Sequence, residues 1–181
     1  MALSSTLLAA EDACELEVRG AIPAAVLVAL FERKGELHAV FTERRHDLSR
    51  HGGEISFPGG RPEEGDANLL ETALREAHEE IGLDRSEVEI VGALQPTPTL
   101  VTGYAIYPFV GMIAPDQSLT PDPGEVEQIL ELSLAQVAAG YERRRVMRRG
   151  LPIRTDAYEV DGHIIWGATA RIVTDLLDRL G

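Results

Sequence analysis

Three glutamates stand close together in the segment Arg75-Glu76-Ala77-His78-Glu79-Glu80. On a helix, Glu76, Glu79 and Glu80 lie within an arc of roughly 100° along one edge. Carboxylates crowded in this way repel each other, and more strongly where water is partly excluded. Hard divalent cations such as Mg²⁺ and Mn²⁺ prefer oxygen ligands and would compensate this charge. The spacing therefore indicates a divalent-metal site, and the alternative is a solvated acidic face in a chain with 30 Asp and Glu residues.

A helix over residues 67–81 would position these glutamates, and it is the best helix that the sequence predicts. An apolar stripe adjoins the carboxylate edge and consists of Leu70, Ala73, Leu74, Ala77 and Ile81. Asp66 is the candidate N-cap, and Gly82 is the candidate C-terminal stop. The carboxylates are therefore expected to border the buried face of the helix.

The remaining elements alternate between strands and helices. Strands are expected over 24–32 and 37–42 around a Lys34-Gly35 turn, and a short one over 54–57 runs into Pro58-Gly59-Gly60. Further strands are expected over 88–94, 104–113 and 126–132, a hairpin over 157–166, and helices over 133–139 and 169–180. This mixture predicts an α/β or α+β sandwich.

Composition excludes several classes of protein. A chain of 181 residues, 44 % of them hydrophobic, fits one domain with a buried core. No apolar run approaches the ~20 residues of a membrane helix, and no basic segment precedes the short apolar stretch near the N-terminus. We therefore expect neither membrane association nor a cleaved secretory signal. Cys14, the only cysteine, is compatible with a reducing cytoplasm.

Charge restricts the partners of this chain. A net charge of −13 argues against nucleic acid and would also repel a polyanionic small substrate unless metal cations bind first. Basic residues gather in the segment YERRRVMRRG, at Arg143, Arg144, Arg145, Arg148 and Arg149. We expect a solvated basic segment here, and the alternative is contact with a substrate phosphate.

Residues 75–83, with the sequence REAHEEIGL, match the second half of the Nudix box at every position, and Phe57-Pro58-Gly59-Gly60 resembles the loop that opens the box. Two features differ: Asp66 replaces the usual Glu, and eight residues, against the usual seven, separate it from Arg75. The chain thus resembles the Nudix hydrolases. The resemblance implies one Nudix domain over 1–181, a peripheral N-terminal extension of about 20 residues, and an α/β/α sandwich with a mixed central sheet.

The same resemblance implies a chemistry, the hydrolysis of a nucleoside diphosphate linked to another group. It implies Mg²⁺ or Mn²⁺ held by Glu76 and Glu80, with Glu79 assisting and a carbonyl of Gly59 or Gly60 completing the coordination. Such ions bridge diphosphate oxygens, lower the pKa of a bound water and offset charge on the leaving phosphate. Glycines suit this position because their main chain can approach a cation closely.

Two further residues are candidates for catalysis. Arg75 would orient Glu79 or Glu80 by a charge-assisted hydrogen bond, and the alternative is an ordinary surface pair with Glu79. The reaction also needs a general base. Glu125 is the candidate as base or additional metal ligand, although a plain surface glutamate would fit the same sequence, and Glu127 is less favoured.

Other segments carry a narrower similarity, and they are Thr42-Glu43-Arg44, 51–56, 72–77, Val101-Thr102-Gly103-Tyr104 with Pro108, and 165–170. They resemble the coenzyme A pyrophosphatase subfamily, which implies coenzyme A or a derivative as substrate and 3′,5′-ADP with 4′-phosphopantetheine as products. Arg45 departs from the pattern where a small residue is usual, and Ser49 where an Arg is usual, with Arg50 beside it as a substitute. The candidate substrate-binding residues are Arg44, Arg50, Gly59 and Tyr104.

Three alternatives stay open at this stage. The same chemistry fits ADP-ribose, a nucleotide sugar or a damaged nucleoside triphosphate as substrate. An isopentenyl diphosphate isomerase relative would need a catalytic cysteine, and Cys14 lies far upstream of the box. A binding module without catalysis would usually have lost box acids, which are all present here. The family resemblance also implies a homodimer.

Overall fold

The computed structural model describes residues 3–18, 21–47, 53–99, 103–148 and 151–181. The main sheet has eight strands, which are β1 (Ile22–Arg33), β2 (Glu36–Arg44), β3 (Ile55–Ser56), β4 (Gly59–Gly60), β5 (Glu89–Ala93), β6 (Thr97–Pro98), β7 (Tyr104–Met112) and β8 (Val126–Ser133). The second sheet contains β9 (Tyr141–Arg148), β10 (Leu151–Val160) and β11 (His163–Trp166). The helices are η1 (Leu3–Thr6), α1 (Ala10–Glu15), α2 (Leu69–Ile81), η2 (Arg85–Glu87), α3 (Leu134–Ala139) and α4 (Gly167–Leu180).

Strand β1 is the centre of a mixed sheet. It pairs in parallel with β7 and antiparallel with β2 and β4. Its continuous apolar run is explained by burial on both faces. Ala25, Leu27, Ala29 and Phe31 lie in the core on the side of α2, whereas Val26, Val28 and Leu30 lie in the core on the side of α4. This arrangement confirms the predicted fold class.

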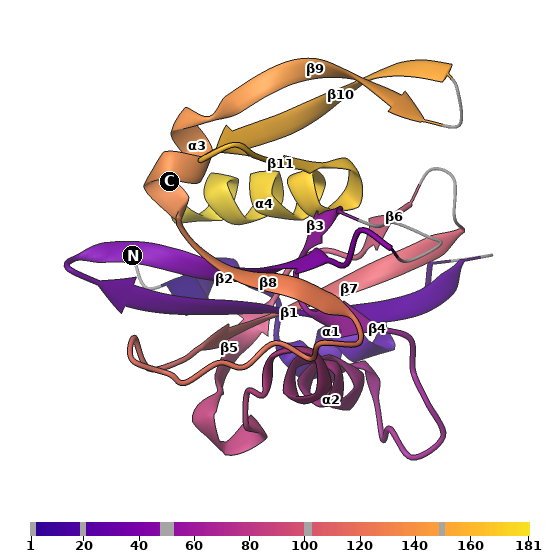
Figure 1. Cartoon of the computed structure of the whole chain (residues 1–181). Coiled ribbons are helices and arrows are strands. Elements are labelled where there is room, and N and C mark those ends of the chain that lie inside the picture. Colours follow the sequence, from indigo (N-terminus) through magenta and orange to yellow (C-terminus); the bar gives the residue numbers. More distant parts are fainter. Residues whose placement is uncertain (1–2, 19–20, 48–52, 100–102, 149–150) are drawn as a thin grey trace.

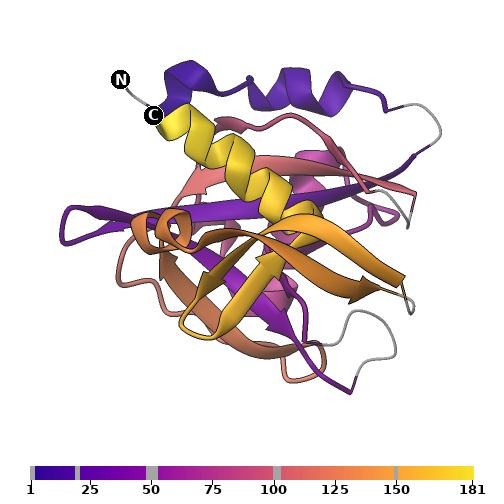
Figure 2. The same ribbon diagram turned by 90° about the horizontal axis from the view of Figure 1, so that it is seen from above.

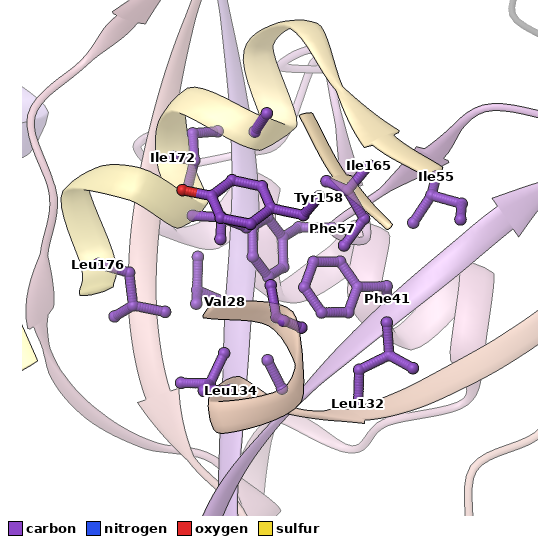
Figure 3. Packing of buried hydrophobic residues seen from close by; sticks show 14 of the residues in the cluster. Val28, Phe41, Ile55, Phe57, Leu132, Leu134, Tyr158, Ile165, Ile172 and Leu176 are labelled. Carbon is purple, nitrogen blue, oxygen red and sulfur yellow. The ribbon is translucent and has the colours of Figure 1, made fainter. Parts of the chain in front are cut away.

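Two hydrophobic cores lie on opposite faces of the main sheet (Figure 1). Helix α2 covers one face with Ala73, Leu74, Ala77 and Ile81. On the other face, α4 and the second sheet enclose the core shown in Figure 3, where the rings of Phe41 and Phe57 stack at 4.5 Å. The glycine loop and the acidic helix are thus anchored by packing on both sides of β1.

The N-terminal segment also packs on the main sheet. Ala10 and Ala13 of α1 are buried, and the hydroxyl of Tyr107 donates to the carbonyl of Leu16 over 2.6 Å. Figure 2 shows η1 beside the end of α4, where Arg179 donates to the carbonyl of Thr6. None of the helices in the described ranges is long and apolar enough to span a membrane.

The structure corrects the predicted start of the acidic helix. Helix α2 begins at Leu69, and its N-cap is Asn68, whose side chain accepts a hydrogen bond from the Glu71 amide over 3.0 Å. Asp66 lies outside the helix and bonds to Arg75 instead. The predicted stop at Gly82 is confirmed, because this residue has a left-handed backbone with φ of 68°.

The C-terminal hairpin is longer than predicted. The β10–β11 hairpin and its Asp161-Gly162 turn are confirmed, with φ of 50° and 83° at the two turn residues. However, β10 begins at Leu151, and the basic segment forms a further strand, β9, paired antiparallel to β10. Strand β9 is an edge strand with only β10 beside it, so it can carry many arginines. These arginines hide the alternation of apolar and polar residues that identifies most strands.

Candidate active site

The glycine loop is built into the main sheet. Gly59 and Gly60 form β4, which pairs with Val26 and Ala25 of β1. A Cβ atom at Gly59 would lie 2.2 Å from the carbonyl oxygen of Ala25, and one at Gly60 would lie 2.2 Å from Oε1 of Glu76. Only glycine fits at Gly59, where the clash is with backbone, and at Gly60 the missing side chain allows the main chain to lie directly against the Glu76 carboxylate.

Arg75 links this loop to the acidic helix. Its guanidinium donates to Asp66 Oδ1 over 3.1 Å, to the Arg61 carbonyl over 3.0 Å, to Glu76 Oε1 over 3.1 Å and to Glu79 Oε2 over 2.8 Å. An ordinary surface pair with Glu79 would have only the last of these contacts. Arg75 thus holds two of the three box glutamates and the chain that leads to them.

Asp66 is the structural partner of Arg75 despite the longer junction before the helix. Its carboxylate also accepts hydrogen bonds from the Thr72 hydroxyl over 2.9 Å and the Glu63 amide over 3.0 Å. The hydrogen bond from Arg75 is the main cause that lowers the pKa of Asp66 to about 2. The extra residue lies in the junction before α2 begins. Asp66 therefore reaches the guanidinium although its side chain is shorter than that of a glutamate.

Glu80 is a buried carboxyl group with little compensation. It is 5 % exposed, and burial raises its pKa to about 8. Arg44 and a backbone hydrogen bond from Gly59 oppose this rise, whereas the charges of Glu76 and Glu125 add to it. Burial also raises the pKa of Glu76. Burial thus disfavours the charged form of both neighbouring carboxyl groups, and further positive charge would compensate this.

The positive charge nearest to Glu80 comes from Arg44, at the end of β2. Its guanidinium lies 3.8 Å from Glu80 Oε1 and 3.5 Å from Glu125 Oε2. Glu125 stands just before β8, and its side chain is 53 % exposed. The structure thus brings together candidates from three distant segments: the end of β2, helix α2 and the segment before β8.

Two of the remaining candidates, Glu79 and Tyr104, have partners elsewhere in the fold. The Glu79 side chain, at the exposed edge of α2, is 56 % exposed and bonds to Arg75. Tyr104 begins β7 and pairs with Ile22 of β1. Ile22 is three residues from Ala25, the partner of Gly60, which corresponds to roughly 10 Å along the strand. Arg50 lies outside the described residues.

The donor set fits a hard divalent cation, although the side chains are not yet arranged around one. Within the described ranges, no three carboxylate, imidazole or thiol side chains are gathered closely enough to hold an ion. Glu80 supplies buried carboxylate oxygens and Glu76 half-buried ones, and the Gly60 main chain lies against Glu76. Such oxygen donors are those that Mg²⁺ and Mn²⁺ prefer.

Two features of this region were not predicted from the sequence. Asn68 with Glu71 three residues later is a cap signal that a search for capping boxes would have found. The amide of Asp122 donates to the carbonyl of Glu80 over 2.9 Å and attaches the segment of Glu125 to the helix. This contact joins residues far apart in the chain, and no local pattern indicates it.

The fold and the box geometry define the class of this protein. The family model for the NUDIX domain matches residues 21–150, most of the chain, so the chain belongs to the Nudix family. It is 36 % identical over 160 residues to the uncharacterized Nudix hydrolase NudL of Escherichia coli O1:K1, covering 87 % of this chain and 82 % of NudL. The NudL of Shigella boydii serotype 18 gives the same figures. The protein is therefore a Nudix hydrolase.

Solved structures support the same fold. The NUDIX domain of Shewanella oneidensis NrtR, complexed with ADP ribose, aligns with a TM-score of 0.59 at 13 % identity, covering 94 % of this chain and 97 % of that domain. A C. elegans Ap4A hydrolase aligns with a TM-score of 0.53 at 15 % identity, covering 63 % and 81 %. At these identities the likeness concerns the architecture of the domain.

Proposed function

We propose that this Nudix hydrolase is a divalent-metal-dependent pyrophosphatase that cleaves the diphosphate of coenzyme A or a derivative. The products would be 3′,5′-ADP and 4′-phosphopantetheine, or its acylated form. One observation carries the metal dependence: Glu80 is buried beside Glu76, and its pKa is raised to about 8 although Arg44, its cationic partner among the described residues, lies 3.8 Å away. Burying a carboxyl group without adequate compensation lowers the stability of the fold. Such groups are found mainly at functional sites.

Glu76, Glu80 and the Gly60 carbonyl would hold the ion, Mg²⁺ or Mn²⁺, with Glu79 assisting. When bound, the metal supplies charge that offsets the diphosphate and lowers the pKa of the attacking water. Arg75 keeps Glu76 and Glu79 on the metal side of the helix through its contacts of 3.1 and 2.8 Å. This role follows from the fixed fork geometry of a guanidinium.

Glu125 is our candidate for the general base. Its side chain is half-exposed and ends 3.5 Å from Arg44, so it faces solvent and the buried carboxylates together. In the reaction, Glu125 would accept the proton of the water that attacks phosphorus. Arg44, placed between Glu125 and Glu80, would then be free to donate to an incoming phosphate oxygen. Gly59, adjacent to the metal-facing Gly60, would let the substrate phosphates approach the main chain.

The subfamily resemblance supports coenzyme A as substrate, and two of its segments lie together in the fold. Residues Thr42 and Glu43 pair with β3, and Arg44 reaches the carboxylates. Ile165 of β11 lies in the same core as Ile55 of β3 (Figure 3). These two segments, more than a hundred positions apart, thus pack against each other, as expected if they serve one substrate.

Product analysis tests the proposal. The protein would be incubated with Mg²⁺ or Mn²⁺ and either coenzyme A or ADP-ribose, and the products would be identified by mass spectrometry. We expect 3′,5′-ADP from coenzyme A and faster turnover of coenzyme A than of ADP-ribose. Hydrolysis of ADP-ribose without formation of 3′,5′-ADP would contradict the substrate assignment. Calorimetry that detected no binding of either metal would contradict metal dependence.

Two accompanying proposals rest on the resemblance and on composition. We propose that the protein is a homodimer, which light scattering on the purified chain measures. We also propose that it acts in the cytoplasm, where its single Cys14 would stay reduced, and fractionation of cells tests this location.

A further inference from the structure

Arg45 follows Arg44 at the end of β2, but it contacts a different part of the molecule. Its backbone amide donates to the carbonyl of Glu125 over 3.0 Å, and its Nη1 donates to the carbonyl of Pro123 over 2.5 Å. Both contacts fall on residues 122–125, which we call the base loop. Arg44 thus contacts the carboxylates of Glu80 and Glu125, whereas Arg45 contacts the main chain of the loop that carries Glu125.

The guanidinium of Arg45 is itself held in place. Asp47 accepts from Nε over 2.9 Å and from Nη2 over 2.5 Å. This bidentate pair fixes the plane of the guanidinium and leaves Nη1 directed at Pro123. A chain of contacts therefore runs from Asp47 through Arg45 to the base loop.

The base loop has a second attachment at its other end. The Asp122 amide donates to the carbonyl of Glu80 over 2.9 Å, at the last turn of α2. Within the loop, the amides of Glu125 and Val126 both donate to the Asp122 carbonyl, over 3.2 and 2.9 Å. Between these ends, the contact from Arg45 to Pro123 connects the loop to β2.

We propose that Arg45 is a positioning residue, which fixes the base loop and thereby holds the Glu125 carboxylate at its place relative to Glu80. The proposal rests on the proposed role of Glu125 as base.

Amide exchange tests the positioning directly, without any substrate. Arg33 provides a matched control, because its guanidinium also joins a carboxylate, Glu131 at 2.7 Å, to a proline carbonyl, Pro115 at 3.0 Å. Its exposure of 40 % is close to the 36 % of Arg45. In Arg45→Ser, the Glu125 and Val126 amides should exchange about 10-fold faster, the effect of losing roughly one hydrogen bond. In Arg33→Ser they should not change. Equal exchange in both variants would overturn the proposal.

A double-mutant cycle then tests whether Arg45 acts through Glu125. In the otherwise unchanged protein, Arg45→Ser should lower kcat about 10-fold with little change in KM. In a Glu125→Gln background the same substitution should have almost no further effect, because the group that it positions is already inactive. An equal loss in both backgrounds would exclude action through Glu125. Arg45→Lys should restore part of kcat, since a lysine can donate to Pro123 but cannot form the bidentate pair with Asp47.

The cycle also separates this inference from the proposed function. If Glu125→Gln keeps full activity while Glu80→Gln loses it, the positioning proposal is overturned and metal-dependent hydrolysis still stands. If coenzyme A is not a substrate, the cycle is measured with ADP-ribose, and the exchange experiment is unaffected.

Discussion

Two clusters of like charge occur in this molecule, and they are treated differently by the fold. The acidic cluster of Glu76, Glu80 and Glu125 lies at the meeting point of α2, β4 and the base loop. Its most buried member is 5 % exposed and has a pKa raised to about 8. The described part of the basic cluster lies on β9, where Arg143 and Arg145 are exposed and Arg144 is half-buried.

Two arginines of the basic cluster are paired with carboxylates of the second sheet. Arg144 Nη1 lies 2.8 Å from Glu159 and 3.1 Å from Glu142, and Arg143 Nε lies 3.5 Å from Asp156. The side chain of Arg143 is 78 % exposed, so water screens its charge as well. A run of charge that looks unusual in the sequence is ordinary in the fold, whereas one glutamate of the box, Glu80, becomes unusual through burial. Burial and compensation, and not the number of charges, distinguish a candidate site from a solvated surface.

The largest expected effect is that of removing the charge of the buried acid. Glu80→Gln keeps the size of the side chain and resembles the protonated form that burial favours, so the protein should fold. Turnover should fall on the order of 10³-fold, because a metal ligand that stabilises the transition state is lost. Steady-state kinetics on coenzyme A measure this. Near-normal turnover would exclude Glu80 as a ligand and would remove the contrast between the two clusters.

A smaller effect is expected on stability in EDTA. The pKa of Glu80 is about 8 when folded, against an ordinary value of 4.5. Between these values the folded state retains a proton that the unfolded chain has released. The free energy of unfolding should therefore decrease as pH rises from about 4.5 to about 8, by a few kcal/mol. Urea unfolding should show a shallower decrease in Glu80→Gln, and identical pH dependence in both proteins would contradict the raised pKa.

The smallest effect is expected in the basic cluster. Arg144→Gln removes exposed ion pairs on β9, and these contribute less than about 1 kcal/mol and weaken with salt. Turnover should stay within about twofold of the original value. If KM for coenzyme A instead rose tenfold while KM for ADP-ribose did not, the cluster would be a contact for the 3′-phosphate.

The parts of the fold that the sequence predicted are those with local causes. The apolar run of β1, the periodicity of α2 and the Asp161-Gly162 turn each depend on neighbouring residues. The predicted cap Asp66 is wrong because Asp and Asn are both good caps, and the local signal that favours Asn68 is Glu71 three residues later. Asp66 bonds to Arg75 instead.

Strand β9 is not predicted from the sequence because its charges are explained only by pairing with another strand. Its arginines have carboxylate partners on β10, up to 15 positions away, and the pairing cannot be inferred until the hairpin register is known. In the candidate site, the box motif identified Glu76, Glu79 and Glu80, and the resemblance indicated Arg44 and Glu125. The contact of Arg45 with Pro123 joins segments 78 positions apart, and only the folded structure shows it.

The two halves of the candidate site differ in how many substitutions each can tolerate. Gly59 of β4 accepts no side chain, because a Cβ atom there would lie 2.2 Å from the carbonyl oxygen of Ala25. On its β2 side the base loop also has main-chain contacts, from the Arg45 amide to Glu125 and between Arg44 and Val126, which survive any change of side chain. Under random drift, side chains would therefore change in the base loop long before a substitution persisted at Gly59.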